Sequence, residues 1–136
     1  MARTRTFRLS EELLTSLEQR SHEHGDSVNA LAERYLEEGL RRENHPLIDF
    51  RDSAAGRRAM LVGTRLEVKH VIDTWLNSDK SVEDTAEYFN LPEGYVRAAV
   101  QYYAAFQDEV DEWRERMLEF ADRAEAAWRR EQALLK

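Results

Sequence analysis

The chain has 136 residues, of which 35% are charged and 42% are hydrophobic, and its formal net charge is -7. This length and balance fit one domain or two small ones and exclude a disordered chain. The sequence has no apolar run of about 18 residues that would make a transmembrane helix, and no apolar segment behind the N-terminal arginines that would make a secretory signal. It has no cysteine either, which excludes disulfides, thiolate chemistry and cysteine-ligated zinc. We therefore expect a mainly α-helical protein of the cytoplasm.

Positive charge is concentrated at the start of the chain. Residues 1–9 contain three arginines and no acid, whereas residues 10–44 sum to -5, residues 45–110 to -4 and residues 111–136 to -1. An acidic protein with one basic edge can still bind nucleic acid, because the local charge sets the field that the phosphates experience.

An alternating segment at residues 4–9 predicts a short β-strand. One face carries Thr4, Thr6 and Arg8, and the other carries Arg5, Phe7 and Leu9. No other strand is near in sequence to satisfy its backbone donors and acceptors, so we expect it to pair with its copy from a second chain. The result would be an intertwined homodimer that shares a two-stranded antiparallel ribbon. Such a ribbon fits the DNA major groove and would expose the first face to base edges.

Two helices are expected after the strand. Ser10 is a suitable N-cap for the first helix, and Gly25 is a suitable end for it. Ser27 is a suitable N-cap for the second. The apolar stripes of both helices, together with the inner face of the strand, predict a dimer core of Phe7, Leu9, Leu13, Leu17, Leu31 and Tyr35.

The stretch RTFRLSEELLTSLEQRSHEHGDSVNALAERYLEEGL resembles the ribbon-helix-helix family of repressors, which includes Arc, MetJ and CopG. The resemblance covers about the first 42 residues. It implies that Thr4, Thr6 and Arg8 read bases and that the amides at the start of the second helix grip a phosphate. Arg5 departs from the family, which usually has an apolar residue there; we expect it at the frayed end of the ribbon or on a phosphate. Arg3 is a further candidate DNA-binding residue. The residues that would grip the phosphate are Ser27, Val28 and Asn29. The alternative is a basic, disordered tail in front of a helical hairpin.

A second domain is expected after a break at Pro46. Two short apolar runs, LIDF and AMLV, flank the loop RDSAAGRR and predict a β-hairpin within residues 48–66. A helix is expected next, with an inward face of Val68, Val71, Ile72, Trp75 and Leu76.

The segment SVEDTAEYFNLPEGYVRAAVQYY predicts two short helices joined by the turn NLP, which is the pattern of a helix-turn-helix. Ser81 and Asp84 form a capping box at its start. A DNA-reading version would present Glu93, Tyr95, Arg97 and Gln101 to the groove. Only one of these four side chains is basic, so a helix-turn-helix that serves only as a fold is an equally open alternative. The second candidate DNA contact consists of Arg65, Tyr95 and Arg97.

Residues 45 to about 112 resemble a small prokaryotic family often described as VapB-type antitoxins. The features that carry the resemblance are HP at 45–46, GTR followed by LEV at 63–68, SVED at 81–84, and YYAAFQDEVDE at 102–112. The glycine-rich loop of that family is altered here to RDSAAGRRAML. The resemblance implies a partner toxin of the PIN-domain ribonuclease type.

The last segment, residues 108–136, contains neither glycine nor proline and predicts a long amphipathic helix. Its apolar stripe recurs at a spacing of three and four residues. Three interpretations compete: the helix packs on its own domain, forms a coiled coil with a second copy, or fills a groove of a toxin. The candidate partner-binding residues are Trp113, Met117, Phe120, Ala124 and Trp128.

The sequence predicts neither a catalytic site, nor a metal site, nor a cofactor. It has no phosphate-binding glycine loop and no nucleophile elbow, and its four histidines do not follow a metal-ligand spacing. We expect three parts: a ribbon-helix-helix domain at 1–44, a helix-turn-helix-like domain at 45–107 and a C-terminal helix at 108–136. The expected function is a DNA-binding antitoxin that neutralises a toxin and represses its own operon. The alternatives are a stand-alone repressor and a dimeric protein-interaction module that binds no DNA.

Overall fold

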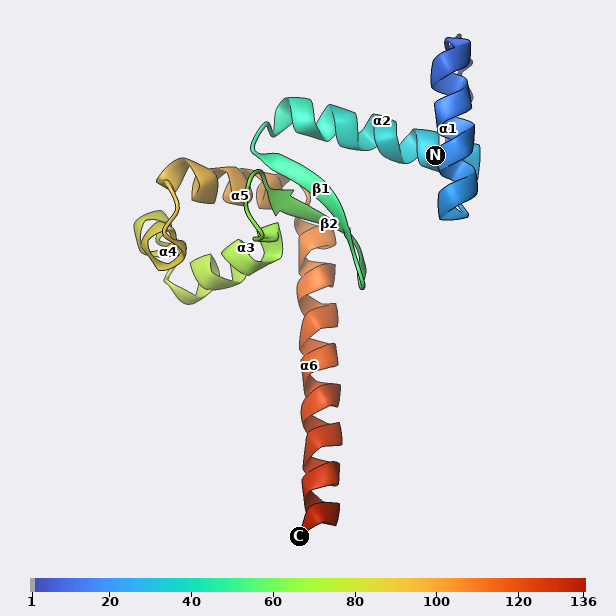
Figure 1. Cartoon of the computed structure of the whole chain (residues 1–136). Helices are drawn as coiled ribbons and strands as arrows, with labels where there is room; N and C mark the ends of the chain where they lie inside the picture. The colour runs from blue at the N-terminus through green and yellow to red at the C-terminus, as the bar shows by residue number, and fades with distance from the viewer. Residues whose placement is uncertain (1) are drawn as a thin grey trace. The chain divides into compact units, whose positions relative to one another are not determined.

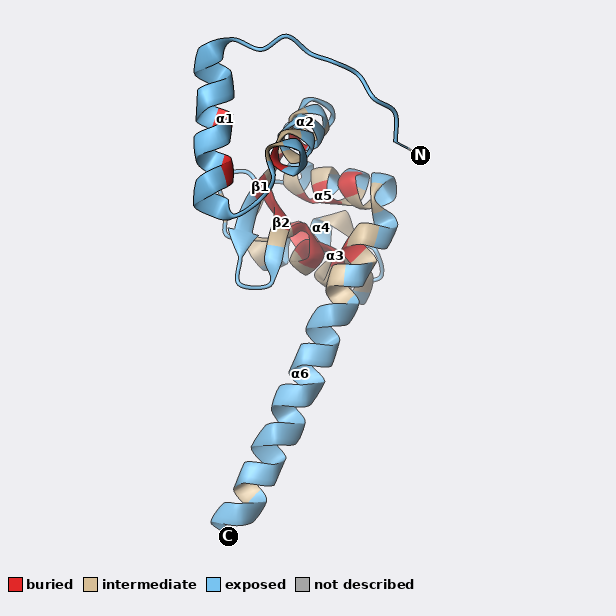
Figure 2. Cartoon of the chain, turned by 90° about the vertical axis from the view of Figure 1, so that its right-hand side faces the viewer, coloured by how far each residue is buried: buried red, intermediate tan, exposed pale blue. Residues whose placement is uncertain are grey.

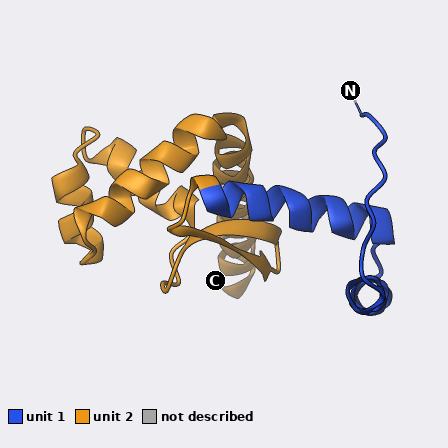
Figure 3. Ribbon diagram, turned by 90° about the horizontal axis from the view of Figure 1, so that it is seen from above, with its two compact units in different colours: residues 1–43 blue, residues 44–136 orange. Residues whose placement is uncertain are grey.

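The computed structural model describes residues 2–136, which form six helices and one two-stranded antiparallel sheet (Figure 1). In chain order the elements are α1 (Glu11–His24), α2 (Val28–Asn44), β1 (Ile48–Ser53), β2 (Gly56–Leu61), α3 (Val68–Asn77), α4 (Val82–Phe89), α5 (Glu93–Ala105) and α6 (Gln107–Leu135). The expectation of a mainly helical protein with one short hairpin is confirmed. The chain divides into two compact units, residues 1–43 and residues 44–136 (Figure 3).

The first unit is a pair of helices whose ends follow the predicted caps. The Ser10 hydroxyl accepts a hydrogen bond from the Leu13 amide at 3.2 Å, and the Ser27 hydroxyl accepts one from the Ala30 amide at 3.0 Å. Gly25 ends α1 at a φ of 74°, a left-handed conformation that glycine adopts without a steric penalty. Residues 2–9 form no strand within the single chain. The ribbon predicted there needs a second chain, so it stays a prediction.

The second unit begins with the hairpin, whose strands are longer than the sequence suggested. They pair from Ile48 opposite Leu61 to Ser53 opposite Gly56, which leaves a two-residue turn. The Ser53 hydroxyl donates to the Gly56 carbonyl at 2.7 Å and accepts from the Ala55 amide at 3.2 Å, and these bonds close the turn. The predicted eight-residue loop RDSAAGRR was therefore wrong in extent, because its outer residues lie in the strands.

Helices α3, α4 and α5 pack with the hairpin and the start of α6 around one apolar core. The predicted inward residues of α3 are confirmed, with Val68, Val71 and Ile72 fully buried and Trp75 and Leu76 packed against the core. The Ser81 hydroxyl caps α4 by accepting from the Asp84 amide at 3.0 Å. The core consists of Ile48, Phe50, Ala59, Leu61, Val68, Val71, Ile72, Ala86, Val96, Ala99, Tyr102 and Val110.

Tyr102 is the largest fully buried side chain, and the sequence did not single it out. Its ring lies 4.7 Å from that of Phe106 and 5.4 Å from that of His45, centroid to centroid. Its hydroxyl donates to a Glu109 carboxylate oxygen at 2.9 Å, which satisfies the polar end of the buried ring. This side chain joins the HP dipeptide, α5 and α6.

Candidate functional site

The N-terminal segment presents its basic and hydroxyl side chains to solvent. Thr4, Thr6 and Arg8, the predicted base-reading residues, are all exposed, as are Arg3 and Arg5. None of the three arginines takes part in an ion pair among residues 2–136. Three uncompensated guanidinium groups are therefore available to an anionic partner.

The start of α2 offers backbone donors in the same unit. The Ser27 hydroxyl occupies the Ala30 amide, and the Leu31 amide bonds the Ser27 carbonyl at 3.0 Å. The amides of Val28 and Asn29 belong to the first helical turn, where no intrahelical acceptor exists. Asn29 is exposed and Val28 is half-buried. The phosphate contact at these amides stays a prediction, and the carboxylate of Asp26 stands just before the helix.

An apolar hollow of about 230 Å³ lies in the first unit, and its exposed wall is apolar. Phe7, Leu13 and Tyr35 line it and are 63%, 54% and 41% exposed in the single chain. Leu17 also lines it but is buried, and Leu31 is buried within the unit. The full lining is Phe7, Leu9, Leu13, Leu17, Ala32, Tyr35 and Leu36. Five of the six residues of the predicted dimer core thus line this hollow.

The three residues of the second candidate DNA contact differ in exposure and in their partners. Arg65 is exposed in the turn before α3, and Arg97 is exposed on α5 but pairs with Glu93 at 3.2 Å. Tyr95 is half-buried and packs against the core of the second unit. Part of the ring stabilises the fold, and its contact with DNA stays a prediction. The outer face of α5 thus has one basic side chain, and that side chain is paired with Glu93 while remaining 61% exposed.

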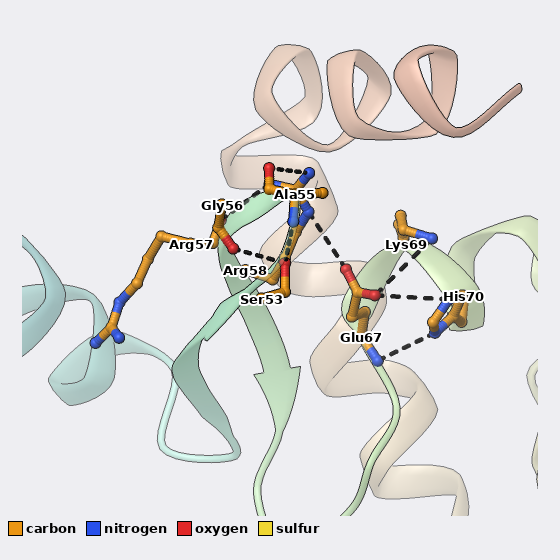
Figure 4. Close-up of polar contacts among 8 residues, drawn as sticks. All are labelled: Ser53, Ala55, Gly56, Arg57, Arg58, Glu67, Lys69 and His70. Carbon is orange, nitrogen blue, oxygen red and sulfur yellow. Dashed lines mark hydrogen bonds and ion pairs between the residues drawn. The ribbon is translucent and has the colours of Figure 1, made fainter. Parts of the chain in front are cut away.

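A polar cluster that the sequence did not reveal lies where the hairpin meets α3 (Figure 4). Arg58 is only 4% exposed, and its guanidinium donates to the carbonyls of Arg57 and Ala55 at 3.1 and 3.0 Å. Its Nε lies 3.4 Å from a carboxylate oxygen of Glu67, and Lys69 lies 4.0 Å from the other oxygen. The carboxylate thus compensates two buried cations.

His70 borders this cluster as a neutral acceptor. The Glu67 amide donates to His70 Nδ1 at 3.3 Å. Burial, and next the charge of Lys69, lower the pKa of His70 below its ordinary value. The neutral imidazole is therefore part of the cap at the start of α3.

The first two turns of α6 are anchored in the second unit. Val110 is fully buried, and Trp113 packs against the core with the Arg58 guanidinium 5.1 Å from its ring centroid. Arg114 donates to Asp73 on α3 and, at 3.0 Å, to Asp111. Burial alone would lower the pKa of Arg114, but these two carboxylates raise its pKa overall. In the single chain the Trp113 ring is part of this domain's own packing, and its contact with a partner stays a prediction.

Beyond Arg114 the helix leaves the core, and Figure 2 shows it as exposed almost to its end. Met117 is 39% exposed, Phe120 is 66% exposed and Trp128 is 58% exposed, and Ala124 is also exposed. Of the three interpretations of the tail, packing on its own domain holds only for the first turns. The other four predicted partner-binding residues remain uncovered in the single chain.

Comparison of the chain with protein-family models, with curated proteins and with solved structures gave no match. Within residues 2–136, no three side chains that could ligate a metal come together. No helix in that range is both long and apolar enough to cross a membrane.

Proposed function

We propose that this protein is a homodimeric DNA-binding antitoxin that represses its own operon and neutralises a toxin, which the resemblance of its second unit suggests is a PIN-domain ribonuclease. The observation that carries the proposal is the pairing, within one unit, of an uncompensated basic segment with an uncovered apolar hollow. Phe7 lies between Thr6 and Arg8 in sequence, so the same segment supplies both features.

The apolar hollow supports the dimer. Phe7 and Leu9 would insert between two copies of α1 and α2 when their strands pair, and burial would remove Leu13 and Tyr35 from water as well. Fully burying one large apolar side chain contributes about 1.5–3 kcal/mol, so the several side chains of the hollow are a substantial driving force for association. Alternation along the strand would then leave Thr4, Thr6 and Arg8 on the outer face of the ribbon.

The exposed part of α6 supports a protein partner. A helix that leaves its domain with Met117, Phe120 and Trp128 facing water presents the anchors that usually dominate protein interfaces. Because this surface lies on a different unit from the basic segment, DNA binding and toxin binding would use separate parts of the chain.

Two assays test the proposal. The full chain should bind a duplex from upstream of its own gene more tightly than a scrambled duplex of equal length and composition. Its co-expression should restore growth to cells that carry the product of the neighbouring reading frame, while a chain ending at Leu118 should not. The proposal fails if the full chain neither distinguishes the duplexes nor restores growth.

The competing function is a dimeric interaction module without DNA binding. It is favoured by the net charge of -7 and by the outer face of α5, which has a single basic side chain, Arg97. Growth rescue without any binding to the upstream duplex would select this alternative. Duplex binding without rescue would instead select a stand-alone repressor.

A further inference from the structure

The exposed part of α6 has a regular heptad pattern whose edges differ in charge. The seam positions fall at 110, 113, 117, 120, 124, 127, 131 and 134. Val110 and Trp113 pack in the core of the second unit, so the exposed part of the seam, which we call the free seam, begins at Met117. Ala121, Trp128 and Leu135 extend the apolar surface on one side, which makes it wider than the narrow stripe of a two-stranded coiled coil.

A second copy of α6 is a poor occupant of this surface. Glu131 occupies a seam position, where two copies in a parallel pair would bring like charges together. Ala124 and Ala127 occupy consecutive seam positions and would bury little area between two helices. An antiparallel pair would place the arginine edges of the two helices against each other, which is repulsive.

The edge on the other side of the seam is consistently basic. Arg116, Arg123 and Arg130 recur every seven residues directly beside the seam, and no acid occupies this row beside the free seam. Arg116 and Arg123 pair with Glu112 and Glu119 at 2.5 and 3.5 Å, but those acids lie one row farther from the seam. The guanidinium groups remain 59% and 79% exposed at the side-chain level, so they are free to make a second contact. Acids elsewhere on the helix, such as Glu115 and Asp122, lie on the opposite face.

We propose that α6 docks into an apolar groove whose rim carries acidic side chains along the Arg116–Arg123–Arg130 edge. The occupant is a protein other than this chain, and this inference rests on the proposed toxin partner and specifies the surface that it presents. The apolar seam supplies affinity, and the arginine row fixes which way the helix lies in the groove, because only one edge meets the acidic rim.

Arg123 and Arg129 provide a matched pair for the test. Both side chains are largely exposed, at 79% and 71%, and each pairs with a glutamate four residues earlier, at 3.5 and 2.6 Å. Arg123 borders the seam, whereas Arg129 lies on the opposite face of the helix. Arg123→Glu and Arg129→Glu therefore make the same change in charge and break the same type of intrahelical pair, so they differ only in position.

The experiment measures the binding of full-length wild type, Arg123→Glu and Arg129→Glu to the purified product of the neighbouring reading frame by titration calorimetry. Arg123→Glu should weaken binding roughly threefold to tenfold in low salt, and Arg129→Glu should change it less than twofold. The difference should shrink in 0.5 M salt, where the Debye length falls to roughly 4 Å. Equal effects of the two variants, with tight wild-type binding, would overturn the acidic rim while leaving the proposed function intact.

Sedimentation of the full chain and of a chain ending at Leu118 tests the rival occupant. We expect the same number of protomers in both, because the first unit holds the dimer. A smaller assembly after truncation would show that a second copy covers α6 and would overturn the inference. If wild type does not bind the neighbouring product, the proposed function fails together with this inference.

Discussion

Truncation of α6 at two different points separates its structural part from its exposed part. A chain ending at Leu118 keeps Val110 and Trp113 and one further turn, which lets their carbonyls retain helical hydrogen bonds. A chain ending at Glu109 loses both side chains. The helix has no buried residue after Val110, so the first truncation removes only surface and the second removes core.

The expected magnitudes follow from burial. Val110 is fully buried, which is worth about 1.5–3 kcal/mol. Trp113 is half-buried, and its loss should cost about 2 kcal/mol, roughly half of the value for a fully buried tryptophan. The loss of both side chains in the second truncation should therefore lower the free energy of unfolding by about 4 kcal/mol. For a domain of this size, each kcal/mol lowers the Tm by about 4–8 °C, so the Tm should fall by at least roughly 15 °C.

The chain ending at Leu118 should melt within about 4 °C of the full chain, because surface changes usually stay within about 0.5 kcal/mol. Differential scanning calorimetry of the protein without any partner measures both values. A large drop in Tm for the chain that ends at Leu118 would contradict this expectation, since it would mean that residues 119–136 pack on their own domain.

Other predictions concern the two units separately. Arg8→Ala should weaken binding to the upstream duplex by about 1–3 kcal/mol with the dimer intact; unchanged anisotropy titrations of the folded variant would remove its role in base reading. Phe7→Asp should abolish dimerisation and DNA binding together, and a wild type that sediments as a monomer at micromolar concentration would contradict the shared ribbon. Arg58→Met should cost about 3 kcal/mol in urea unfolding, because it leaves the half-buried Glu67 carboxylate with Lys69 at 4.0 Å as its remaining buried cation. Arg57→Met should cost less than about 1 kcal/mol, because its partner Asp52 is 61% exposed. Equal costs would show that burial does not distinguish the two arginines. Because the folded pKa of His70 lies below its unfolded value near 6.5, the unfolded state binds the proton more readily, so its contribution to stability is present above that pH and is lost as the pH falls below it. His70→Gln should flatten this part of the stability profile, and an unchanged profile would exclude the effect.

Helix boundaries were predictable because their causes are local. Ser10, Ser27 and Ser81 each accept from an amide three residues later, and Gly25 takes the left-handed conformation expected of it. Each of these interactions depends on a few neighbouring residues, so the sequence alone reveals it.

The polar cluster was not predictable because its partners are distant in sequence. Arg58 was interpreted as part of a charged loop, since an isolated arginine in a strand is usually exposed. Its burial depends on Glu67 and on Trp113, which a pattern around the hairpin cannot reveal. The Ser53–Gly56 turn was missed for a different reason: it is local, but the charged residues on either side of it were interpreted as loop although they lie in the strands.

The apolar stripe of the C-terminal helix was predictable from the sequence. Which part of it packs on the core and which part is exposed was not. Periodicity treats Trp113 and Phe120 alike, because both occupy the same heptad position. Only the fold shows that Arg58 and the core cover Trp113, whereas Phe120 is 66% exposed. On α5, the helix-turn-helix pattern did not indicate that Tyr95 contacts the core, although it lies four residues before the buried Ala99.

The salt dependence of DNA binding tests directly whether the basic N-terminal segment contacts DNA phosphates. Arg3 and Arg5 from each protomer would release about four counterions from the duplex, which gives a slope of roughly -3 to -5 in a plot of log affinity against log salt concentration. Anisotropy titrations of the full chain with its own upstream duplex measure this slope, and Arg3→Gln/Arg5→Gln should flatten it by more than half. We expect that steep slope for the wild type and its loss in the variant. No binding at low salt, or a slope near zero, would contradict it.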